Sequence, residues 1–473
     1  MNTLRSRADF DVDVLVVGGG PAGVALALRL QRLGYDVLLV APQTRRFGSS
    51  HEFETLAPAA QGQLHVLGLQ SALGAARRTR VEFEIRWGSD RFEARAPSDL
   101  IDRNAFLAAL RKLALDADVQ VWDGGVDAFR RTECGWRVTL TSTGGPREAK
   151  TRSLVDATGR RGLFSSRSRR GPALVAIHAI WSGEDLPQKL RVAAGPQAWV
   201  WGAPASDGRY VTTVFQDPRE AKREGQDLNE RVNRAVVEAG ALIGASRLVL
   251  LELTGVSDAT PQMKDAYDGR GFFRVGDAVL AVDPLSSSGV QTALQSASDT
   301  ALAIHTLRHD PKATTLAATF LNSRLERRRA RHAAWAAAFY REGATRFPDV
   351  FWTERAGSAR NDMAEANAEA PAPLPPPDQP VALDSAIRIE PEACAVGDLI
   401  ELRGAVNHPS LAEPVVFVAG IEISHLLAQV APGSKARSLV RDWSRHVGED
   451  SAVRIFSWAW RNRLIFPSSA RLP

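Results

Sequence analysis

A glycine-rich turn near the N-terminus constrains the fold more than any other feature of the sequence. It follows an apolar, β-branched run at residues 12–17 and precedes a helical pattern and a second apolar run at residues 37–40. In such a turn Gly18 permits the tight bend, Gly20 lets the backbone approach a pyrophosphate, and Gly23 allows the helix to pack closely. The pattern predicts a βαβ unit that binds a dinucleotide, with the phosphates at the helix N-terminus.

One usual feature of a dinucleotide-binding unit is missing. The acidic residue that commonly ends the second strand and binds the adenosine ribose is replaced by Ala41, and Pro42 and Gln43 follow it. Gln43 or a neighbouring backbone group is left to contact the ribose. Arg45 is our candidate for a pyrophosphate contact, although arginines in loops are more often simply solvated.

Two later segments are predicted to complete the nucleotide site. Residues 154–159 form an apolar strand that ends in small residues at Gly159. Another strand ends at Gly276, and the carboxylate of Asp277 then stands where it can bind a hydroxyl of the cofactor. The following segment leads into a helix through Pro284, Ser288 and Gly289.

In this order and at these separations, the three segments resemble the FAD-dependent aromatic hydroxylase and halogenase superfamily. The resemblance implies FAD as the cofactor and a p-hydroxybenzoate hydroxylase-like α/β fold, in which a Rossmann-like FAD-binding fold carries an inserted antiparallel substrate sheet. Asp102 and Arg103 fit the same family, whose arginine at this helix start approaches the flavin, so Arg103 is carried over as a flavin contact. The helix that opens at Gly289 would then direct its N–H groups at the flavin pyrimidine edge and stabilise the negative charge of the reduced ring.

Changes in composition divide the chain into two domains. Residues 1–355 are predicted to form the FAD-binding monooxygenase domain, with substrate-sheet insertions at about residues 75–100 and 173–270. An Ala- and Pro-rich linker at residues 356–380 is predicted to be extended and semi-rigid. Residues 381–473 are predicted to form a small α+β, winged-helix-like domain.

The small C-terminal domain is predicted to have a three-helix core, because its apolar side chains recur at helical intervals. These positions are Leu426, Leu427, Val430, Leu439, Val440, Trp443, Val453, Phe456 and Trp460. The order of elements looks like that of the small winged-helix domains that hold leader peptides in peptide-modifying systems. A tethered domain of this kind would dock a polypeptide and raise its local concentration.

Composition argues against several classes of function. The net charge of +5 and the pI of about 9.4 come from scattered basic residues, which argues against nucleic-acid binding. Cys134 and Cys394 are the only cysteines, and their spacing supports neither a disulfide framework nor a metal site. No apolar run approaches the length of a membrane span, and the first residues do not form a signal peptide. We therefore expect a cytoplasmic protein with no membrane or nucleic-acid partner.

Tryptophan halogenation is the first activity to weigh within the superfamily. Trp199 and Trp201 look like the paired-tryptophan motif of the flavin-dependent tryptophan halogenases. That chemistry needs a lysine upstream of the first inserted strand, but no lysine precedes Lys112 here. It also needs a glutamate in the halide segment, where this chain has Ser286. Two catalytic groups are therefore absent, and we interpret the two tryptophans as packing residues of the sheet.

A closer resemblance is to the maturation flavoproteins of quinone-cofactor enzymes, such as those of quinohemoprotein amine dehydrogenase and of lysine and glycine oxidases. The matching segments are residues 54–58, 87–90, 102–106 and 283–287. These flavoproteins are similar to monooxygenases that act on tryptophan side chains within a polypeptide. The resemblance implies hydroxylation of a peptidyl tryptophan that becomes a tryptophylquinone, with molecular oxygen activated as a flavin hydroperoxide.

Such a reaction also needs a proton acceptor and an electron donor. His51 and Glu54, in the loop expected to face the substrate, are the candidate catalytic residues, although a lone histidine in a loop is more often structural. Electrons would come from NADH, NADPH or a separate flavin reductase, because no second dinucleotide motif is present. Two alternatives stay open: a flavin-dependent hydroxylase or halogenase of a free small aromatic molecule, and a non-catalytic flavin-fold scaffold that binds a maturing partner.

Overall fold

The structure, a computed structural model, describes residues 10–42, 53–163, 167–205, 207–221, 227–357 and 373–468. The contacts within the chain separate it into two compact units. Unit 1 comprises Met1–His305 and Leu321–Arg360, and unit 2 comprises Thr306–Phe320 and Asn361–Pro473. Residues 306–320, which contain the end of one long helix, a turn and the start of the next, therefore group with the C-terminal part of the chain.

Unit 1 contains a seven-stranded sheet built around β1 (Phe10–Val17). Its parallel strands are, in spatial order, β6 (Gln120–Trp122), β2 (Val37–Val40), β1, β9 (Arg147–Asp156) and β17 (Phe272–Arg274). The antiparallel strands that extend the sheet beside β9 are β8 (Gly135–Thr141) and β7 (Gly125–Thr132). The register places Val17 between Val40 and Asp156, so the carboxyl ends of β1, β2 and β9 meet at one edge.

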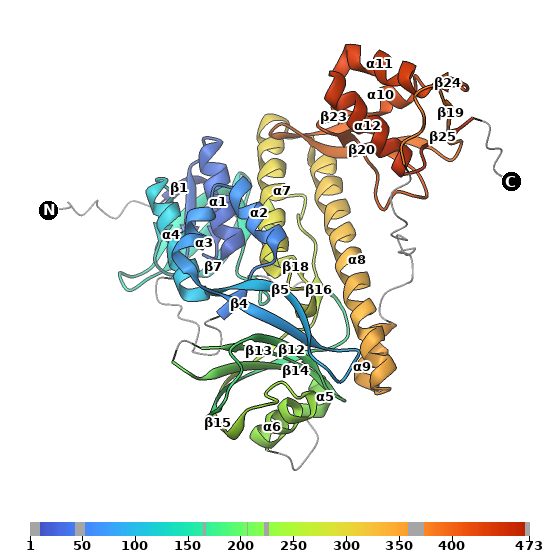
Figure 1. The fold of residues 1–473 in the computed structure, drawn as a ribbon. Coiled ribbons are helices and arrows are strands. Elements are labelled where there is room, and N and C mark those ends of the chain that lie inside the picture. Colours follow the sequence, from blue (N-terminus) through green and yellow to red (C-terminus); the bar gives the residue numbers. More distant parts are fainter. Residues whose placement is uncertain are drawn as a thin grey trace. The chain divides into compact units, whose positions relative to one another are not determined.

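α1 (Pro21–Arg32) connects β1 to β2 and confirms the predicted βαβ unit. Pro21 occupies its first position, where a backbone N–H would have no partner within the helix, so the lack of an N–H in proline costs no hydrogen bond. α4 (Arg103–Asp116) packs beside α1 (Figure 1). It begins after Asp102, whose carboxylate accepts a hydrogen bond from the N–H of Ala105 at 2.9 Å. This cap fixes the point at which the helix starts, and therefore the position from which the Arg103 side chain projects.

The second sheet of unit 1 has eight strands. In spatial order they are β15 (Ser246–Asp258), β11 (Val175–Glu184), β14 (Tyr210–Gln216), β13 (Ala198–Pro204), β12 (Leu190–Ala194), β4 (Arg77–Arg86), β5 (Glu93–Asp102) and β3 (Phe53–Thr55). The sheet is antiparallel as predicted except at one pair, where β12 runs parallel to β4 with Leu190 opposite Phe83. These two strands come from distant parts of the chain, so no hairpin turn sets their relative direction.

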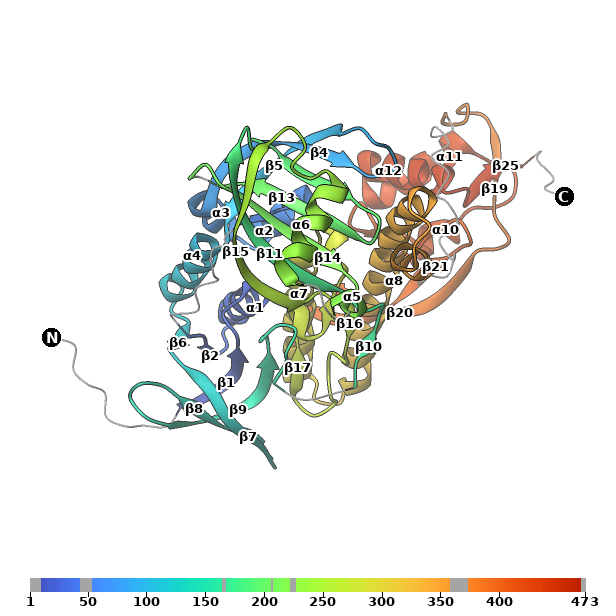
Figure 2. The same ribbon diagram turned by 90° about the horizontal axis from the view of Figure 1, so that it is seen from below.

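The two faces of the second sheet have different partners. α6 (Leu228–Ala239) covers one face (Figure 2), where Val232 packs in one cluster with Trp181 and Val200. The opposite face carries Trp199 and Phe215, which cluster with Leu285 in the segment after β17. The sheet therefore presents an aromatic face to the third of the predicted nucleotide segments.

Two long helices, α7 (Gly289–His309) and α8 (Thr314–Arg346), follow the sheets. In unit 1 the carboxylate of Asp299 on α7 forms an ion pair with Arg328 on α8 at 2.5 Å, and both side chains are almost fully buried. The remaining elements of unit 1 are α2 (Pro58–Val66), α3 (Gln70–Ala76), α5 (Pro218–Ala221), α9 (Val350–Ala356), β10 (Arg169–Arg170), β16 (Gln262–Met263), β18 (Leu280–Ala281) and the 3₁₀ turns η2 (Gly276–Ala278) and η3 (Pro284–Ser286).

Unit 2 has a hydrophobic core of its own. Its strands are β19 (Pro380–Leu383), β20 (Arg388–Val396), β21 (Leu399–Asn407), β22 (Phe417–Val418), β23 (Ile421–Glu422), β24 (Ser434–Lys435) and β25 (Ile465–Pro467), and its helices include α10 (Ser424–Leu427), α11 (Ala436–Val447) and α12 (Glu449–Arg461). Leu426, Leu439 and Trp443 lie in the core, as their spacing predicts. Val453 does not: it is 43% exposed, because Ala452 and its helical neighbours form the buried stripe of α12.

Candidate functional site

The glycine-rich turn lies between β1 and α1 and against the end of β9. Gly18 has a φ of +123°, and a Cβ there would stand 2.2 Å from the carbonyl oxygen of Ala157. A Cβ on Gly23 would stand 1.9 Å from the carbonyl oxygen of Gly18. Packing alone therefore requires glycine at both positions. At Gly20 a Cβ would meet no atom within 4 Å, so this part of the backbone faces open space.

The segment after β9 is shaped by a buried carboxylate. Asp156 accepts hydrogen bonds from the N–H and hydroxyl of Thr158, at 3.0 and 2.6 Å, and from the N–H of Leu163 at 2.7 Å. These bonds bend the chain through Gly159, which has a φ of +80°. Asp156 is fully buried, so it holds the turn in place and is not itself available to a ligand. The sequence gives Gly159 as a site residue and leaves this carboxylate unassigned.

The third segment packs directly on the start of α1. Gly276 has a φ of +62°, a Cβ there would lie 2.9 Å from the Cβ of Ala22, and its N–H donates to Ser296 Oγ at 2.8 Å. The close approach places Asp277 beside the glycine-rich turn. Residues predicted from three separate segments of the sequence are thus brought together.

Side chains of alternating charge line this meeting point. Arg160 Nε lies 3.5 Å from Asp277 Oδ2, and Arg103 Nε lies 3.9 Å from Glu54 Oε2. Burial among protein atoms raises the pKa of the Asp277 carboxyl, and the positive charges of Arg160 and Arg103 act against that rise. The side chain of Asp277 nevertheless keeps 39% of its surface exposed, so it is held among protein atoms but remains open to a ligand.

A capped turn leads from Asp283 into α7. The carboxylate of Asp283 accepts the N–H of Leu285 at 3.0 Å, and Ser287 takes the left-handed conformation with a φ of +46°. Pro284 is the first residue of η3, the hydroxyl of Ser288 donates to the carbonyl of Ser286 at 2.7 Å, and Gly289 is the first residue of α7. These contacts fix the direction in which the N-terminus of α7 points.

The residues present fit a bound FAD. The open space at Gly20 suits a diphosphate at the N-terminus of α1, and Asp277 offers an accessible acceptor for a hydroxyl. The hydroxyls of Ser286 and Thr292, at the start of α7, are buried and have no hydrogen-bond partner in the part of the chain that the structure describes. Such groups match a polar, partly anionic ring at the helix N-terminus.

Asp277→Ala is expected to raise the dissociation constant of FAD roughly tenfold, because it removes a partly buried hydrogen-bond acceptor. The measurement is the quenching of flavin fluorescence on titration with the protein. Asp116→Ala is the matched control, because Asp116 is a half-exposed carboxylate on α4 that pairs with Lys112 at 2.6 Å. Equal affinity in the wild type and in Asp277→Ala would show that Asp277 does not contact the cofactor.

Some predicted site residues are not brought into this group. His51, Gln43 and Arg45 lie outside the described residues. Ala41, where an acidic residue is usual, is buried at the end of β2, and its carbonyl oxygen accepts a hydrogen bond from Arg111 Nη1 at 2.7 Å. Arg111 on α4 therefore occupies the neighbourhood of the missing acid. Nothing in its sequence context distinguishes it from other surface-helix arginines.

The two tryptophans of β13 pack against other apolar side chains of the sheet, as predicted. Trp199 is buried and stacks on Phe215, with ring centroids 3.8 Å apart, and Trp201 is partly buried against the neighbouring cluster. The first lysine, Lys112, points into solvent from α4 with 73% of its side chain exposed.

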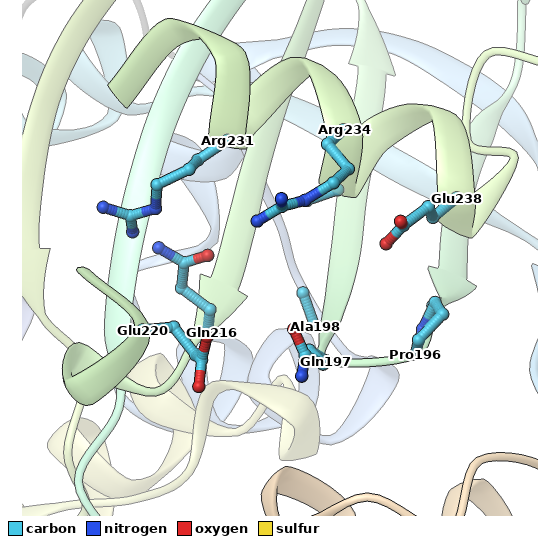
Figure 3. A pocket seen from close by; sticks show the side chains of 10 residues that line it. Pro196, Gln197, Ala198, Gln216, Glu220, Arg231, Arg234 and Glu238 are labelled. Atoms are coloured by element: carbon cyan, nitrogen blue, oxygen red, sulfur yellow. The ribbon is translucent and has the colours of Figure 1, made fainter. Parts of the chain in front are cut away.

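A separate polar cavity lies on the α6 side of the second sheet (Figure 3). Arg231 and Arg234 of α6 point toward Gln216 on β14, and Glu220 and Glu238 bring opposite charges to the same cavity. Gln216 follows Phe215 along the strand, so it faces away from the aromatic face that packs on Leu285. The cavity is therefore distinct from the nucleotide site.

Comparisons with known proteins agree with this geometry. A family model described as glucose inhibited division protein A matches residues 13–173. A tryptophan 2-halogenase from Chondromyces crocatus is 28% identical over 377 residues, which is 72% of this chain and 70% of that protein. A flavin-dependent halogenase from Armillaria mellea is 23% identical over 62% of this chain, and the match spans 66% of its length, just under two thirds. The protein is an FAD-dependent oxidoreductase.

Solved structures show that this flavoenzyme shares its fold with hydroxylases and halogenases. The peptidyl tryptophan dihydroxylase QhpG, described as essential for tryptophylquinone cofactor biogenesis, has a TM-score of 0.74 at 24% identity and covers 96% of this chain and 99% of its own. The flavin-dependent halogenase CmlS has a TM-score of 0.74 at 17% identity, with 98% and 97% covered. The predicted fold class is confirmed.

Two features are absent from the described part of the flavoenzyme. In the described ranges no helix is long and apolar enough to cross a membrane. Among the same residues, no group of three or more histidine, cysteine, aspartate or glutamate side chains is placed to hold a metal ion.

Proposed function

We propose that this flavoenzyme is a monooxygenase that hydroxylates a tryptophan side chain in a partner polypeptide, as a step in forming a tryptophylquinone. The observation that carries the proposal is the likeness to the peptidyl tryptophan dihydroxylase, which extends over 96% of this chain and 99% of that one. The likeness thus includes unit 2 as well as the flavin-binding part. The sequence supports the same choice, because Ser286 stands where a halogenase has glutamate.

The reaction requires the protein mainly to position the substrate beside the flavin. Bound FAD, reduced by NADH, NADPH or a flavin reductase, supplies an activated form of molecular oxygen. One oxygen atom replaces a ring hydrogen of the electron-rich indole as a hydroxyl group, and the other is reduced to water by the two electrons from the donor together with two protons. The chain has to orient the indole, exclude water and accept the ring proton.

Glu54 is the proton acceptor that we propose. It lies on β3 opposite Ile101, at the end of β5 and just before Arg103 begins α4. Its carboxylate is 29% exposed and lies 3.9 Å from Arg103, so it remains open to a substrate bound above the nucleotide site. Arg103 also acts on Asp277, where its positive charge opposes the rise in pKa that burial causes, so one arginine is shared by the proposed acceptor and the proposed cofactor contact.

The test is oxidation of a panel of tryptophan-containing polypeptides by the FAD-loaded protein, with a flavin reductase and NADH, in buffer that contains bromide. We expect tryptophan residues that gain the mass of one or two oxygen atoms, with oxygen consumption that depends on the polypeptide. Glu54→Gln should slow the reaction without changing FAD affinity. Oxidation of free indoles alone, with all polypeptides left unmodified, would contradict the proposal.

Halogenation is the second candidate, because the two sequence relatives described above are named as halogenases and one of them as a tryptophan 2-halogenase. The same assay decides between the two. Incorporation of bromine into free tryptophan or into a polypeptide, in place of oxygen, would favour halogenation and would show that a group other than the usual lysine and glutamate can serve. We expect no brominated product.

We also propose that unit 2 docks the partner polypeptide. A substrate residue held within a polypeptide needs contact surface beyond a small-molecule cavity. Unit 2 has a separate core, formed by residues between Val381 and Ile465, so it can present such a surface without contributing to the core of unit 1.

A further inference from the structure

Two buried side chains, Trp199 and Tyr340, and the partly buried Asp283 form a hydrogen-bonded chain from the second sheet to the turn that opens α7. The indole N–H of Trp199 on β13 donates to Tyr340 Oη at 3.4 Å, and the Tyr340 hydroxyl donates to Asp283 Oδ2 at 3.1 Å. Asp283 also accepts the N–H of Leu285 at 3.0 Å. The residues come from a strand, from α8 and from a loop, so only the folded unit 1 brings them together.

Chemistry fixes the direction of this chain. An indole N–H can only donate, so Tyr340 Oη accepts from Trp199, and the proton of the Tyr340 hydroxyl is then directed to the carboxylate of Asp283. Trp199 and Tyr340 are each 2% exposed, which leaves water little access to replace either bond. The ring of Tyr340 is held by Trp352 and Phe351, with centroids 5.9 and 6.2 Å away.

Asp283 depends on these donors. Burial raises the pKa of its carboxyl, and the N–H of Leu285, the hydroxyl of Tyr340 and the positive charges of Arg355 and Arg160 act against the rise. A buried carboxylate that loses a donor becomes harder to keep ionised and in place. Because the same carboxylate caps η3, its position is coupled to the N–H groups of residues 285–287.

We infer that Tyr340 is a positioning residue, which holds Asp283 and through it the turn that presents the N-terminus of α7. Trp199 extends the link to the aromatic face of the second sheet. Trp199, one of the two tryptophans of the motif, therefore has a structural role in this chain that does not depend on halogenation. That the presented helix end serves the flavin rests on the proposed function; that Tyr340 holds the turn does not.

The test is Tyr340→Phe, which removes the hydroxyl and keeps the ring in its aromatic cluster. Hydrogen–deuterium exchange of the Leu285, Ser286 and Ser287 amides in the protein without substrate should become roughly tenfold faster. The midpoint potential of bound FAD should also become more negative, because the helix end stabilises the reduced ring less well. Exchange at the three amides is independent of what the enzyme oxidises, so it can be interpreted even if the proposed function fails.

Tyr210→Phe is the matched control. Tyr210 is also fully buried in unit 1, but its hydroxyl donates to the carbonyl of Lys189 at 2.9 Å. It should leave exchange at residues 285–287 unchanged. Unchanged exchange in folded Tyr340→Phe, or equal acceleration in both variants, would overturn the inference. If Tyr340→Phe does not fold, Asp283→Asn tests the same link from its other end and leaves the aromatic cluster intact; slow exchange in that variant would also overturn it.

Discussion

Gly20→Glu is expected to weaken FAD binding by about 100-fold or more while leaving the melting temperature of the protein without cofactor close to that of the wild type. A Cβ at Gly20 meets no atom within 4 Å, so the substitution does not disturb packing. It does place a carboxylate in the space proposed for the diphosphate, at a helix N-terminus where the two negative groups would compete. Fluorescence titration with FAD and thermal unfolding measure the two effects separately.

Two further glycine variants sharpen this experiment. Gly20→Ala should bind FAD with only a modest loss, because a methyl group adds no charge. Gly23→Ala should instead destabilise the protein itself, by roughly 1–3 kcal/mol, because its Cβ would overlap the carbonyl of Gly18. If Gly20→Glu binds FAD with wild-type affinity, the cofactor does not occupy the space at this turn, whatever the stability of the other variants.

The turn shows why part of the site can be predicted from sequence. Gly18, Gly20 and Gly23 act through local backbone geometry, which depends on residues a few positions apart, and the flanking strand and helix are equally local patterns. The cap of α4 at Asp102 is local in the same way, since its bond reaches only to Ala105. Features of this kind have a sequence signature because the interaction and the signature span the same few residues.

Pairings across long sequence separations have no such signature. Arg160 pairs with Asp277, and Trp199 with Tyr340, across more than 100 positions of the sequence, so only the folded unit 1 brings each pair together. The same holds for Arg111, whose bond to the carbonyl of Ala41 joins α4 to the end of β2. The sequence around an arginine does not indicate its partner, so only the fold shows which arginines lie beside a functional group.

Predictions of strand direction and of the buried face of a helix are wrong for a related reason. An alternating pattern identifies β4 and β12 as strands, but their parallel pairing is decided by the path of the chain between them. In α12, Val453 is one position away from the stripe formed by Ala452, Ile455 and Phe456, so a correct helix assignment still gave a wrong core residue. Burial depends on which face a neighbour covers, and composition does not specify that face.

Truncation after Pro377 is expected to leave FAD binding intact and to lower the rate on a polypeptide substrate at low concentration roughly 100-fold, if unit 2 docks the substrate. The loss should be in KM and not in kcat, because docking raises the local concentration of substrate and takes no part in the oxidation step. High concentrations of the polypeptide should therefore restore most of the rate. Steady-state oxygen consumption at increasing polypeptide concentration gives both constants.

The truncation also removes a partner from the last turn of α7, because the N–H of Ile400 donates to Thr306 Oγ1 at 2.9 Å within unit 2. Thermal unfolding and FAD affinity therefore have to be measured on the truncated protein. Oxidation of a free indole is the matched reaction, since it needs the flavin site but no docking surface. Equal losses on the indole and on the polypeptide would mean that the truncation damages unit 1. An unchanged KM for the polypeptide, with FAD binding intact, would show that unit 2 does not hold the substrate.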